Sequence, residues 1–298
     1  LSYSDSILFV FDFGRFEMKA LPQGKYQVVG LFEDSTSRPL ADRLRPQRLD
    51  QVVGQDHLVG ENGPIGRMVR AQRLASMILW GTPGCGKTTI ARLLADVTDL
   101  HFEPLSAIFS GVADLRKIFE KARDRKAMGQ GTLLFIDEIH RFNKAQQDAL
   151  LPFVESGLLT FIGATTENPS FEVNAALLSR AQVYVLQPLT TQDLRQLLTR
   201  AQQQIRPELS FTPAAKDYLI AHADGDARRL LNLLEQCQSA AQVSQQTEID
   251  ADWLQQSLSP NQRRFDKGGD NFYDQISALH KAVRGSHPDA ALYWFCRM

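Results

Sequence analysis

The sequence has few cysteines and histidines, and this scarcity excludes several kinds of site. Its three cysteines, Cys85, Cys237 and Cys296, lie far apart and form no C-x-x-C pair. The six histidines form no cluster either. We therefore expect neither a disulfide framework nor a zinc site, and the cysteine usage favours a reducing cytosol.

Long apolar runs and an excess of one charge are absent as well. No apolar stretch approaches the roughly 18–20 residues that cross a bilayer. The segment "SILFVFDFGRF" is interrupted by Asp12 and Arg15 and follows no basic segment, so we do not interpret it as a signal peptide. The net charge is −1, so a nucleic-acid partner requires a local basic patch. We predict a cytoplasmic protein without a membrane partner.

The sequence does contain a regular alternation of apolar strand candidates and helical patterns. This alternation predicts an α/β domain with a doubly wound, parallel sheet. After Pro188 the pattern becomes wholly helical. The predicted strands are 77–80, 101–105, 132–136, 158–165 and 183–186, and the later helices are 191–204, 212–222, 227–242, 251–257 and 275–283.

A glycine-rich segment, "GTPGCGKTT", follows the first of these strands and opens a helical run. In this context its glycines let backbone N–H groups turn towards a polyphosphate, and the helix N-terminus adds its positive end. Lys87 can reach the β- and γ-phosphates, and the Thr88 hydroxyl can bind Mg²⁺. The segment predicts a nucleoside triphosphate site at Gly81, Thr82, Pro83, Gly84, Cys85, Gly86, Lys87, Thr88 and Thr89.

Two acidic residues end a later strand, in "TLLFIDEIHRF". Carboxylates at this edge of a parallel sheet face the crevice where ligands bind. Asp137 can hold Mg²⁺, and Glu138 can activate a water in line with the γ-phosphate, which favours hydrolysis over transfer to a small acceptor. A GTPase switch is disfavoured, because "NKAQ" has Gln146 where guanine recognition requires aspartate.

Three weaker signals follow in order along the chain. "FIGATTENPSF" places Thr166 and Asn168 after a strand, where such residues can contact phosphate but more often cap or turn. Arg180 ends "NAALLSR", where an arginine also interacts favourably with a helix dipole. Arg228 and Arg229 open the helix of "GDARRLLNLLE", where a nearby anion would explain them.

The ordered set resembles the AAA+ ATPases, in the branch that contains clamp loaders and RuvB. More closely, "IDEIHRFNKAQQDALLPFVESG", "IGATTENPSFEVNAALLSRAQVYVL" and "GDARRLLNLLE" resemble the RarA (MgsA) family, whose eukaryotic relative is the Werner helicase-interacting protein. The resemblance covers roughly residues 31–298. It implies a P-loop domain with a five-stranded parallel sheet, an all-α lid and the start of a helical C-terminal domain.

The resemblance also assigns roles to individual residues. It implies Lys87 and Thr88 as Walker A residues, Asp137 and Glu138 as the Walker B pair, and Thr166 as sensor 1. Arg180 matches an arginine finger that reaches the ATP of a neighbouring subunit, and Arg228 matches sensor 2. The remaining matches, in the segment that holds adenine, are Arg45, Pro46 and Val53.

The implied function is a DNA-dependent, Mg²⁺–ATP-hydrolysing homo-oligomer, a tetramer in the family, that acts at stalled or gapped replication forks. Single-stranded DNA-binding protein and the replisome are implied partners, on single-stranded, gapped or forked DNA at the nucleoid. A clamp-loader-type subunit is one alternative, disfavoured by "TTENPSFEVN". A nucleotide-gated scaffold with little hydrolysis is another, disfavoured by Glu138 together with Arg180.

We divide the chain accordingly into an appendage (1–34), an AAA+ domain (35–187), a helical lid (188–260) and the start of an oligomerisation domain (261–298). Because residues 1–30 match nothing in the family and the chain stops inside a predicted helix, we expect a fragment with an unrelated N-terminal extension. Thr82 replaces the usual proline of "GPPG", with little expected effect. The eukaryotic zinc finger is missing, so the bacterial type is favoured.

Several residues have two interpretations. Cys85 is either a redox-sensitive thiol or, as we favour, a variable position of the loop. For His140 we favour a surface or packing role. Trp80, Phe135 and Phe142 are expected in or near the core. The candidate phosphate contacts, which are equally explained as solvated charges, are Arg116, Lys117, Arg141 and Lys144.

Overall fold

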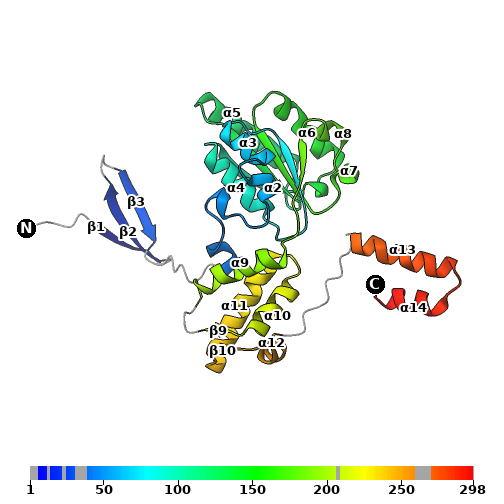
Figure 1. The fold of residues 1–298 in the computed structure, drawn as a ribbon. Helices are drawn as coiled ribbons and strands as arrows, with labels where there is room; N and C mark the ends of the chain where they lie inside the picture. The colour runs from blue at the N-terminus through cyan, green and yellow to red at the C-terminus, as the bar shows by residue number, and fades with distance from the viewer. Residues whose placement is uncertain are drawn as a thin grey trace, which may run out of the picture. The chain divides into compact units, whose positions relative to one another are not determined.

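The structure is a computed structural model that describes residues 6–11, 14–21, 25–30, 39–205, 209–258 and 270–297. The chain divides into two compact units, Leu1–Leu44 and Arg45–Met298. Figure 1 labels the helices from α2 onward together with β1, β2, β3, β9 and β10. The candidate site lies in the second unit.

The first unit contains a three-stranded antiparallel sheet in the order β1-β2-β3. Its sequence is rich in aromatic and β-branched residues, which suit strands. The sequence alone left these residues as an appendage of uncertain order, so the sheet is a new finding. The elements are β1 (Ser6–Phe11), β2 (Gly14–Leu21), β3 (Lys25–Gly30) and the short helix α1 (Leu40–Arg43).

The second unit begins with the α/β domain that the sequence predicted. Its five strands form a wholly parallel sheet in the order β5-β6-β7-β4-β8, which confirms the predicted fold class. The strands lie within two residues of the predicted bounds. They are β4 (Met77–Trp80), β5 (His101–Ser106), β6 (Thr132–Asp137), β7 (Thr160–Thr165) and β8 (Gln182–Val185).

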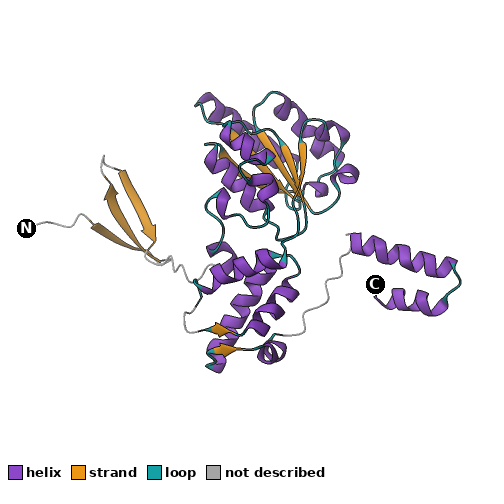
Figure 2. Ribbon diagram, viewed as in Figure 1, coloured by secondary structure: helices purple, strands orange, loops and turns teal. Residues whose placement is uncertain are grey.

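Helices cover both faces of this sheet (Figure 2). Successive residues of a strand point to opposite faces, so Leu133 and Phe135 of β6 join one core while Leu134 and Ile136 join the other. The first core contains residues of α2 (Asp56–Val59), α3 (Pro64–Arg70) and α4 (Lys87–Val97). The second contains residues of α5 (Val112–Ala127), α6 (Lys144–Glu155) and α8 (Ala175–Leu178).

The strand order brings together segments that are far apart in the sequence. β7 lies between β4, which leads into the glycine-rich loop, and β6, which ends at Asp137. In a parallel sheet all carboxyl ends meet at one edge. The Thr165–Thr166 end of β7 therefore lies between the loop and the Asp137–Glu138 pair.

A helical region follows β8, as predicted. Four of its helices begin at a side-chain cap, namely Thr190, Thr212, Asp226 and Asp250, each accepting a backbone N–H. The region is not wholly helical as predicted, because two short strands, β9 (Ser210–Phe211) and β10 (Glu248–Ile249), form a parallel pair in it. The helices are α9 (Thr191–Gln202), α10 (Pro213–Ala223), α11 (Ala227–Ser244) and α12 (Ala251–Ser257).

Two further helices, α13 (Asp270–Arg284) and α14 (Pro288–Arg297), complete the described chain. The first begins five residues before the predicted 275–283 helix. Among all described residues, no helix is long and apolar enough to cross a membrane.

Candidate functional site

The glycine-rich loop joins β4 to α4 and requires glycine for two different reasons. Gly84 and Gly86 have φ values of +72° and +105°, a left-handed region that side chains disfavour. A Cβ on Gly84 would also lie 1.8 Å from Oδ1 of Asp226, at the start of α11. Around Gly86 no atom lies within 4 Å of such a Cβ, so the loop is open on that side.

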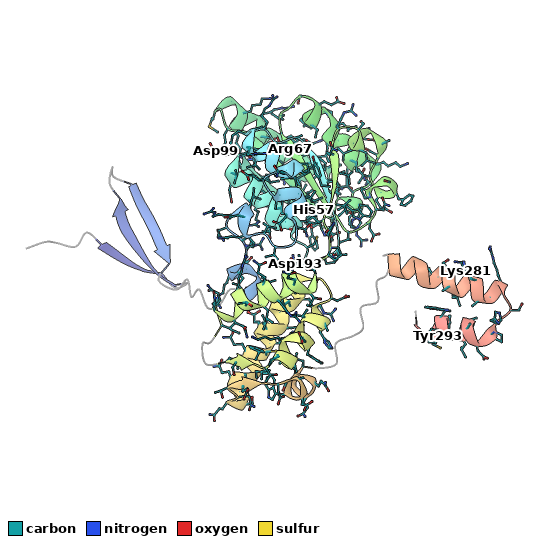
Figure 3. The ribbon with its side chains drawn as sticks, in the orientation of Figure 1. His57, Arg67, Asp99, Asp193, Lys281 and Tyr293 are labelled. Carbon is teal, nitrogen blue, oxygen red and sulfur yellow. The ribbon has the colours of Figure 1, made fainter. Side chains whose placement is uncertain are left out.

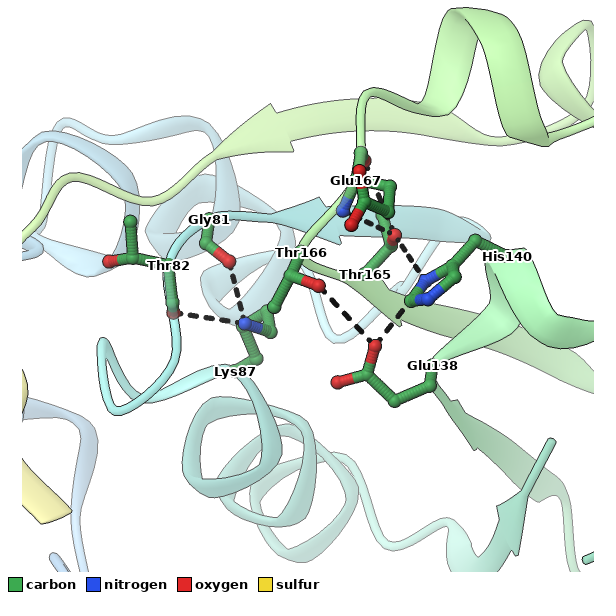
Figure 4. A network of polar contacts seen from close by, with 8 residues as sticks. All are labelled: Gly81, Thr82, Lys87, Glu138, His140, Thr165, Thr166 and Glu167. Carbon is green, nitrogen blue, oxygen red and sulfur yellow. Dashed lines mark hydrogen bonds and ion pairs between the residues drawn. The ribbon is translucent and has the colours of Figure 1, made fainter. Parts of the chain in front are cut away.

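Lys87 is the first residue of α4, and its side chain is buried, at 8% exposure. Its Nζ donates to the carbonyl oxygens of Gly81 (2.7 Å) and Thr82 (3.0 Å), as Figure 4 shows. In the part of the chain that the structure describes, it forms no ion pair with a carboxylate. A buried ammonium without an anionic partner is costly, and a polyphosphate in this loop would compensate it. The residues present therefore fit ATP.

Glu138 follows β6 in a left-handed conformation, with φ of +55°. This bend starts a 3-10 turn, Ile139–Arg141, and leaves the Glu138 side chain half-buried at the sheet edge. Its Oε2 lies 3.5 Å from the Thr166 hydroxyl. Burial raises the pKa of Glu138, the charge of Asp137 raises it further, and Lys87 opposes both effects. Such a perturbed carboxyl group is typical of a functional site.

His140 lies in the same network, which sequence reasoning did not predict. Its side chain is 8% exposed, and its Nδ1 lies 2.9 Å from Oγ1 of Thr165 and 3.3 Å from Oε2 of Glu138 (Figure 4). Thr165 is fully buried and also bonds to both backbone groups of Glu167. Burial lowers the pKa of His140, and Arg141 lowers it further. The expected packing role thus understates its position beside Glu138.

The two predicted Mg²⁺ ligands end at the same edge of the sheet. Thr88 is the second residue of α4, and Asp137 is the last residue of β6. A hydroxyl and a carboxylate are oxygen donors of the kind Mg²⁺ prefers, and it takes its remaining ligands from phosphate and water. Within the described residues no group of three or more His, Cys, Asp or Glu side chains could hold a metal alone.

The predicted adenine segment is tied to the loop by Gln55, which sequence reasoning also missed. Gln55 is fully buried, and its Nε2 donates to the carbonyl oxygens of Gln187 (2.7 Å) and Cys85 (3.4 Å). Its Oε1 accepts the N–H of Gln187 at 3.1 Å. Val53 lies two residues before it, whereas Arg45 and Pro46 precede the 3-10 turn Leu49–Gln51.

The chain around Gln55 contacts both the sheet and the helical region. His57, labelled in Figure 3, contacts the carbonyl oxygen of Val185 at the end of β8, with Nε2 at 3.1 Å. Arg200 of α9 donates to the carbonyl oxygen of Gln51 at 2.9 Å. The helical region therefore meets the α/β domain beside the candidate nucleotide site.

Two arginines of the predicted site, Arg180 and Arg228, are not part of the contact network around Lys87 and Glu138. Arg180 is exposed; it pairs with Glu155 of α6 and donates to the carbonyl oxygen of Ala176 at 2.7 Å. Arg228 is exposed in the first turn of α11, next to Asp226, whose carboxylate caps that helix. Asn168 caps the short helix α7 (Pro169–Glu172), the ordinary role of such a residue after a strand.

Comparison with known families identifies two domains. The model described as "ATPase family associated with various cellular activities (AAA)" matches residues 77–189, and the "AAA C-terminal domain" model matches residues 204–284. Among solved structures, the Thermotoga maritima RuvB Holliday junction branch migration motor has a TM-score of 0.61 at 25% identity. That match covers 80% of this chain and 79% of RuvB.

Curated relatives give a closer match. Replication-associated recombination protein A of Escherichia coli K12 is 48% identical over 274 residues, which cover 90% of this chain and 61% of the relative. The Haemophilus influenzae protein of the same name is 46% identical over 273 residues, covering 90% and 61%. ATPase WRNIP1 of Dictyostelium discoideum is 39% identical over 304 residues, covering 93% and 34%. The chain thus spans about three fifths of the bacterial relatives' length.

The sheet order, the glycine-rich loop and the matching family models define the fold of the AAA class of ATPases. Within that class, the chain belongs to the family of replication-associated recombination protein A.

Proposed function

We propose that this chain is a DNA-dependent AAA+ ATPase that hydrolyses Mg²⁺–ATP and acts at stalled or gapped replication forks, in recombination and replication restart. The observation that carries the proposal is the half-buried Glu138 carboxylate, held beside Thr166 at the edge where the Lys87 loop opens. A carboxylate there suits activation of water, whereas binding alone would not require it.

The proposed chemistry gives each side chain of the site a role. The loop N–H groups and Lys87 would bind the β- and γ-phosphates, and Thr88 and Asp137 would hold Mg²⁺, which would neutralise phosphate charge. Glu138 would accept a proton from a water that attacks the γ-phosphorus, while the bond to the oxygen that bridges to the β-phosphate breaks and ADP leaves. Thr166 would contact the γ-phosphate. The raised pKa of Glu138 strengthens it as a base relative to an ordinary carboxylate.

The remaining arginines are proposed to complete the site. Arg180 would reach the ATP of a neighbouring copy, exchanging its surface pair with Glu155 for a γ-phosphate. Arg228 would contact the nucleotide of its own chain from the start of α11, which already touches the loop at Gly84. This arrangement requires a homo-oligomer, for which a tetramer is the family expectation.

The proposed DNA surface surrounds the connection between β5 and α5. Phe109 is 87% exposed and Ile108 is 58% exposed, an unusual placement for large apolar side chains. The carbonyl oxygen of Ser110 accepts from Nε2 of Gln146 at 3.1 Å, which fixes this connection beside the start of α6. Exposed cations lie on the elements that follow β5 and β6: Arg116 and Lys117 on α5, with Lys117 paired to Asp114, Arg141 in the 3-10 turn after Glu138, and Lys144 at the start of α6.

An exposed aromatic side chain flanked by cations is the combination that binds single-stranded nucleic acid, because the ring stacks on bases while the cations contact phosphates. The names of the bacterial relatives refer to replication and recombination, which supports DNA as the partner. Single-stranded DNA-binding protein, the replisome and a location at the nucleoid in the cytoplasm are proposed from the family resemblance.

The decisive experiment measures steady-state ATP hydrolysis with and without gapped or forked DNA, beside Glu138→Gln. We expect DNA to stimulate turnover, and we expect the variant to lose at least about 100-fold in kcat while still binding ATP. Tight ATP binding without turnover by the unaltered chain would overturn hydrolysis and favour the nucleotide-gated scaffold. Turnover that ignores every DNA tested would overturn the DNA-dependent part alone.

A further inference from the structure

We infer that His140 is a positioning residue for Glu138: its ring links the Glu138 carboxylate to the end of β7 and so sets the direction in which that carboxylate faces. The inference rests on the proposed hydrolysis of ATP and identifies a residue that neither the motifs nor the family matches assign. It stands on two short contacts of one nitrogen, Nδ1, to Thr165 and to Glu138.

The hydrogen bonds around Thr165 determine which nitrogen of the His140 ring carries the proton. The Thr165 hydroxyl has one proton, which it donates to the carbonyl oxygen of Glu167 at 3.2 Å. Its lone pairs accept the N–H of Glu167 at 3.0 Å and, at 2.9 Å, Nδ1 of His140. Because the Thr165 hydroxyl gives its proton to Glu167, Nδ1 is the donor in the hydrogen bond to Thr165, and Oε2 of Glu138 lies 3.3 Å from the same nitrogen as an electrostatic contact. We therefore assign the proton of the neutral ring to Nδ1.

The backbone explains why this ring meets both partners. The left-handed Glu138 turns the chain back on itself, and the N–H of Arg141 closes the turn on the carbonyl oxygen of Glu138 at 2.8 Å. Ile139, the residue between, is fully buried in the core. The turn therefore directs His140 towards β7, and its ring is held on a packed support rather than in solvent.

The link has a consequence for the reaction. Thr165 and Thr166 are neighbours at the end of β7, and Thr166 contacts the same oxygen of Glu138 that His140 contacts. A phosphate that engages Thr166 must therefore change the set of donors around this oxygen. His140 then holds Oε2 of Glu138 in place, while Oε1 of the same carboxylate remains available to a water.

The first test compares His140→Ala with His140→Asn, whose amide N–H can occupy the place of Nδ1. We expect His140→Ala to lower kcat about 10- to 100-fold, as misplacement of a reacting group does, with an almost unchanged KM and affinity for ATP. His140→Asn should recover most of the loss. His222→Ala, on an exposed histidine of α10, is the matched control and should leave kcat unaltered.

A second test combines His140→Ala with Thr165→Val. If the two side chains act through one link, the double variant should lose little more than the worse single variant. The inference is overturned if His140→Ala keeps the unaltered kcat, or if Asn fails to recover activity and both variants also lose ATP binding and thermal stability, as a purely structural role predicts. Absence of turnover by the unaltered chain would instead overturn the proposed function.

Discussion

Two connections of the α/β domain reverse the usual placement of residues in opposite ways. Where the connection from β4 enters α4, the charged side chain of Lys87 is buried, at 8% exposure. Between β5 and α5, the apolar side chains of Ile108 and Phe109 are exposed. Charged residues are rarely buried without a partner, and large apolar side chains that are exposed together often mark a binding site.

The difference between the two connections indicates which kind of ligand each would bind. Among the described residues Lys87 donates to two neutral carbonyl oxygens, and the proposed triphosphate would give this buried cation an anionic partner. For the exposed aromatic ring the proposed partner is a nucleic-acid strand, whose bases stack on aromatic side chains while its phosphates meet cations. Both connections end at the same edge of the sheet, so one molecule can present both ligands on one rigid support.

The largest effect is expected from Lys87→Ala. ATP affinity should fall at least about 100-fold, equivalent to about 2.8 kcal/mol, because the charge that meets the phosphates is gone. The nucleotide-free variant should melt at the same temperature as the unaltered chain or higher, because a costly buried charge has been removed. Calorimetric titration with ATP and thermal unfolding of the free protein measure the two quantities.

Lys144→Ala, at an exposed lysine of α6, is the matched control and should change neither quantity. A large fall in the melting temperature of nucleotide-free Lys87→Ala, with ATP affinity retained, would contradict the comparison. It would show that the bonds to Gly81 and Thr82 stabilise the fold and that the burial of Lys87 needs no ligand.

The fold of the α/β domain was largely predictable because its strands are short, apolar and separated by regular helical patterns. Their bounds were found to within two residues, since periodicity is a local signal. The sheet of β1, β2 and β3 was not predicted: the segment has alternating aromatic residues and a Pro-Gln-Gly turn, but it shares no pattern with the rest of the chain, so it was left as an appendage of uncertain order. Strand order is a tertiary property, which the sequence yields only through resemblance.

The site was predictable where its chemistry lies in one contiguous segment. Lys87 and Glu138 stand in short motifs whose residue types follow from phosphate and water chemistry. His140 and Gln55 were missed because their partners lie 25 and 132 residues away, at Thr165 and Gln187. The left-handed turn at Glu138 that directs His140 has no signature in the residue types, since glutamate is unusual in that conformation.

An intermediate effect is expected from Phe109→Ala. Single-stranded DNA should bind more weakly by about 1–3 kcal/mol, the range for loss of one stacked base, while hydrolysis in the absence of DNA stays unchanged. Fluorescence anisotropy with a labelled oligonucleotide measures the affinity. Met128→Ala removes a side chain of 76% exposure at the other end of α5 and should leave DNA affinity unaltered.

Unchanged DNA affinity in Phe109→Ala, or an equal loss in Met128→Ala, would break the second half of the comparison. Loss of basal hydrolysis in Phe109→Ala would also count against it, because the connection would then serve the nucleotide site. If Phe109→Ala abolished binding of a protein partner and left DNA binding unchanged, the exposed ring would belong to a protein-binding surface.

The smallest effect concerns Cys85. Its rate of alkylation tests whether solvent is excluded from the glycine-rich loop. Burial raises the pKa of Cys85, and that of Cys237 to about 12, so both thiols stay protonated near neutral pH, whereas Cys296 is exposed. Because the thiolate is the reactive form, iodoacetamide should modify Cys296 first, and Cys85 only slowly until the pH is well into the alkaline range. Peptide mass spectrometry, with Cys296→Ser as control, reports each site. Modification of Cys85 as fast as that of Cys296 would mean that the loop opens to solvent, and the cost assigned to the buried Lys87 charge would then fall with it.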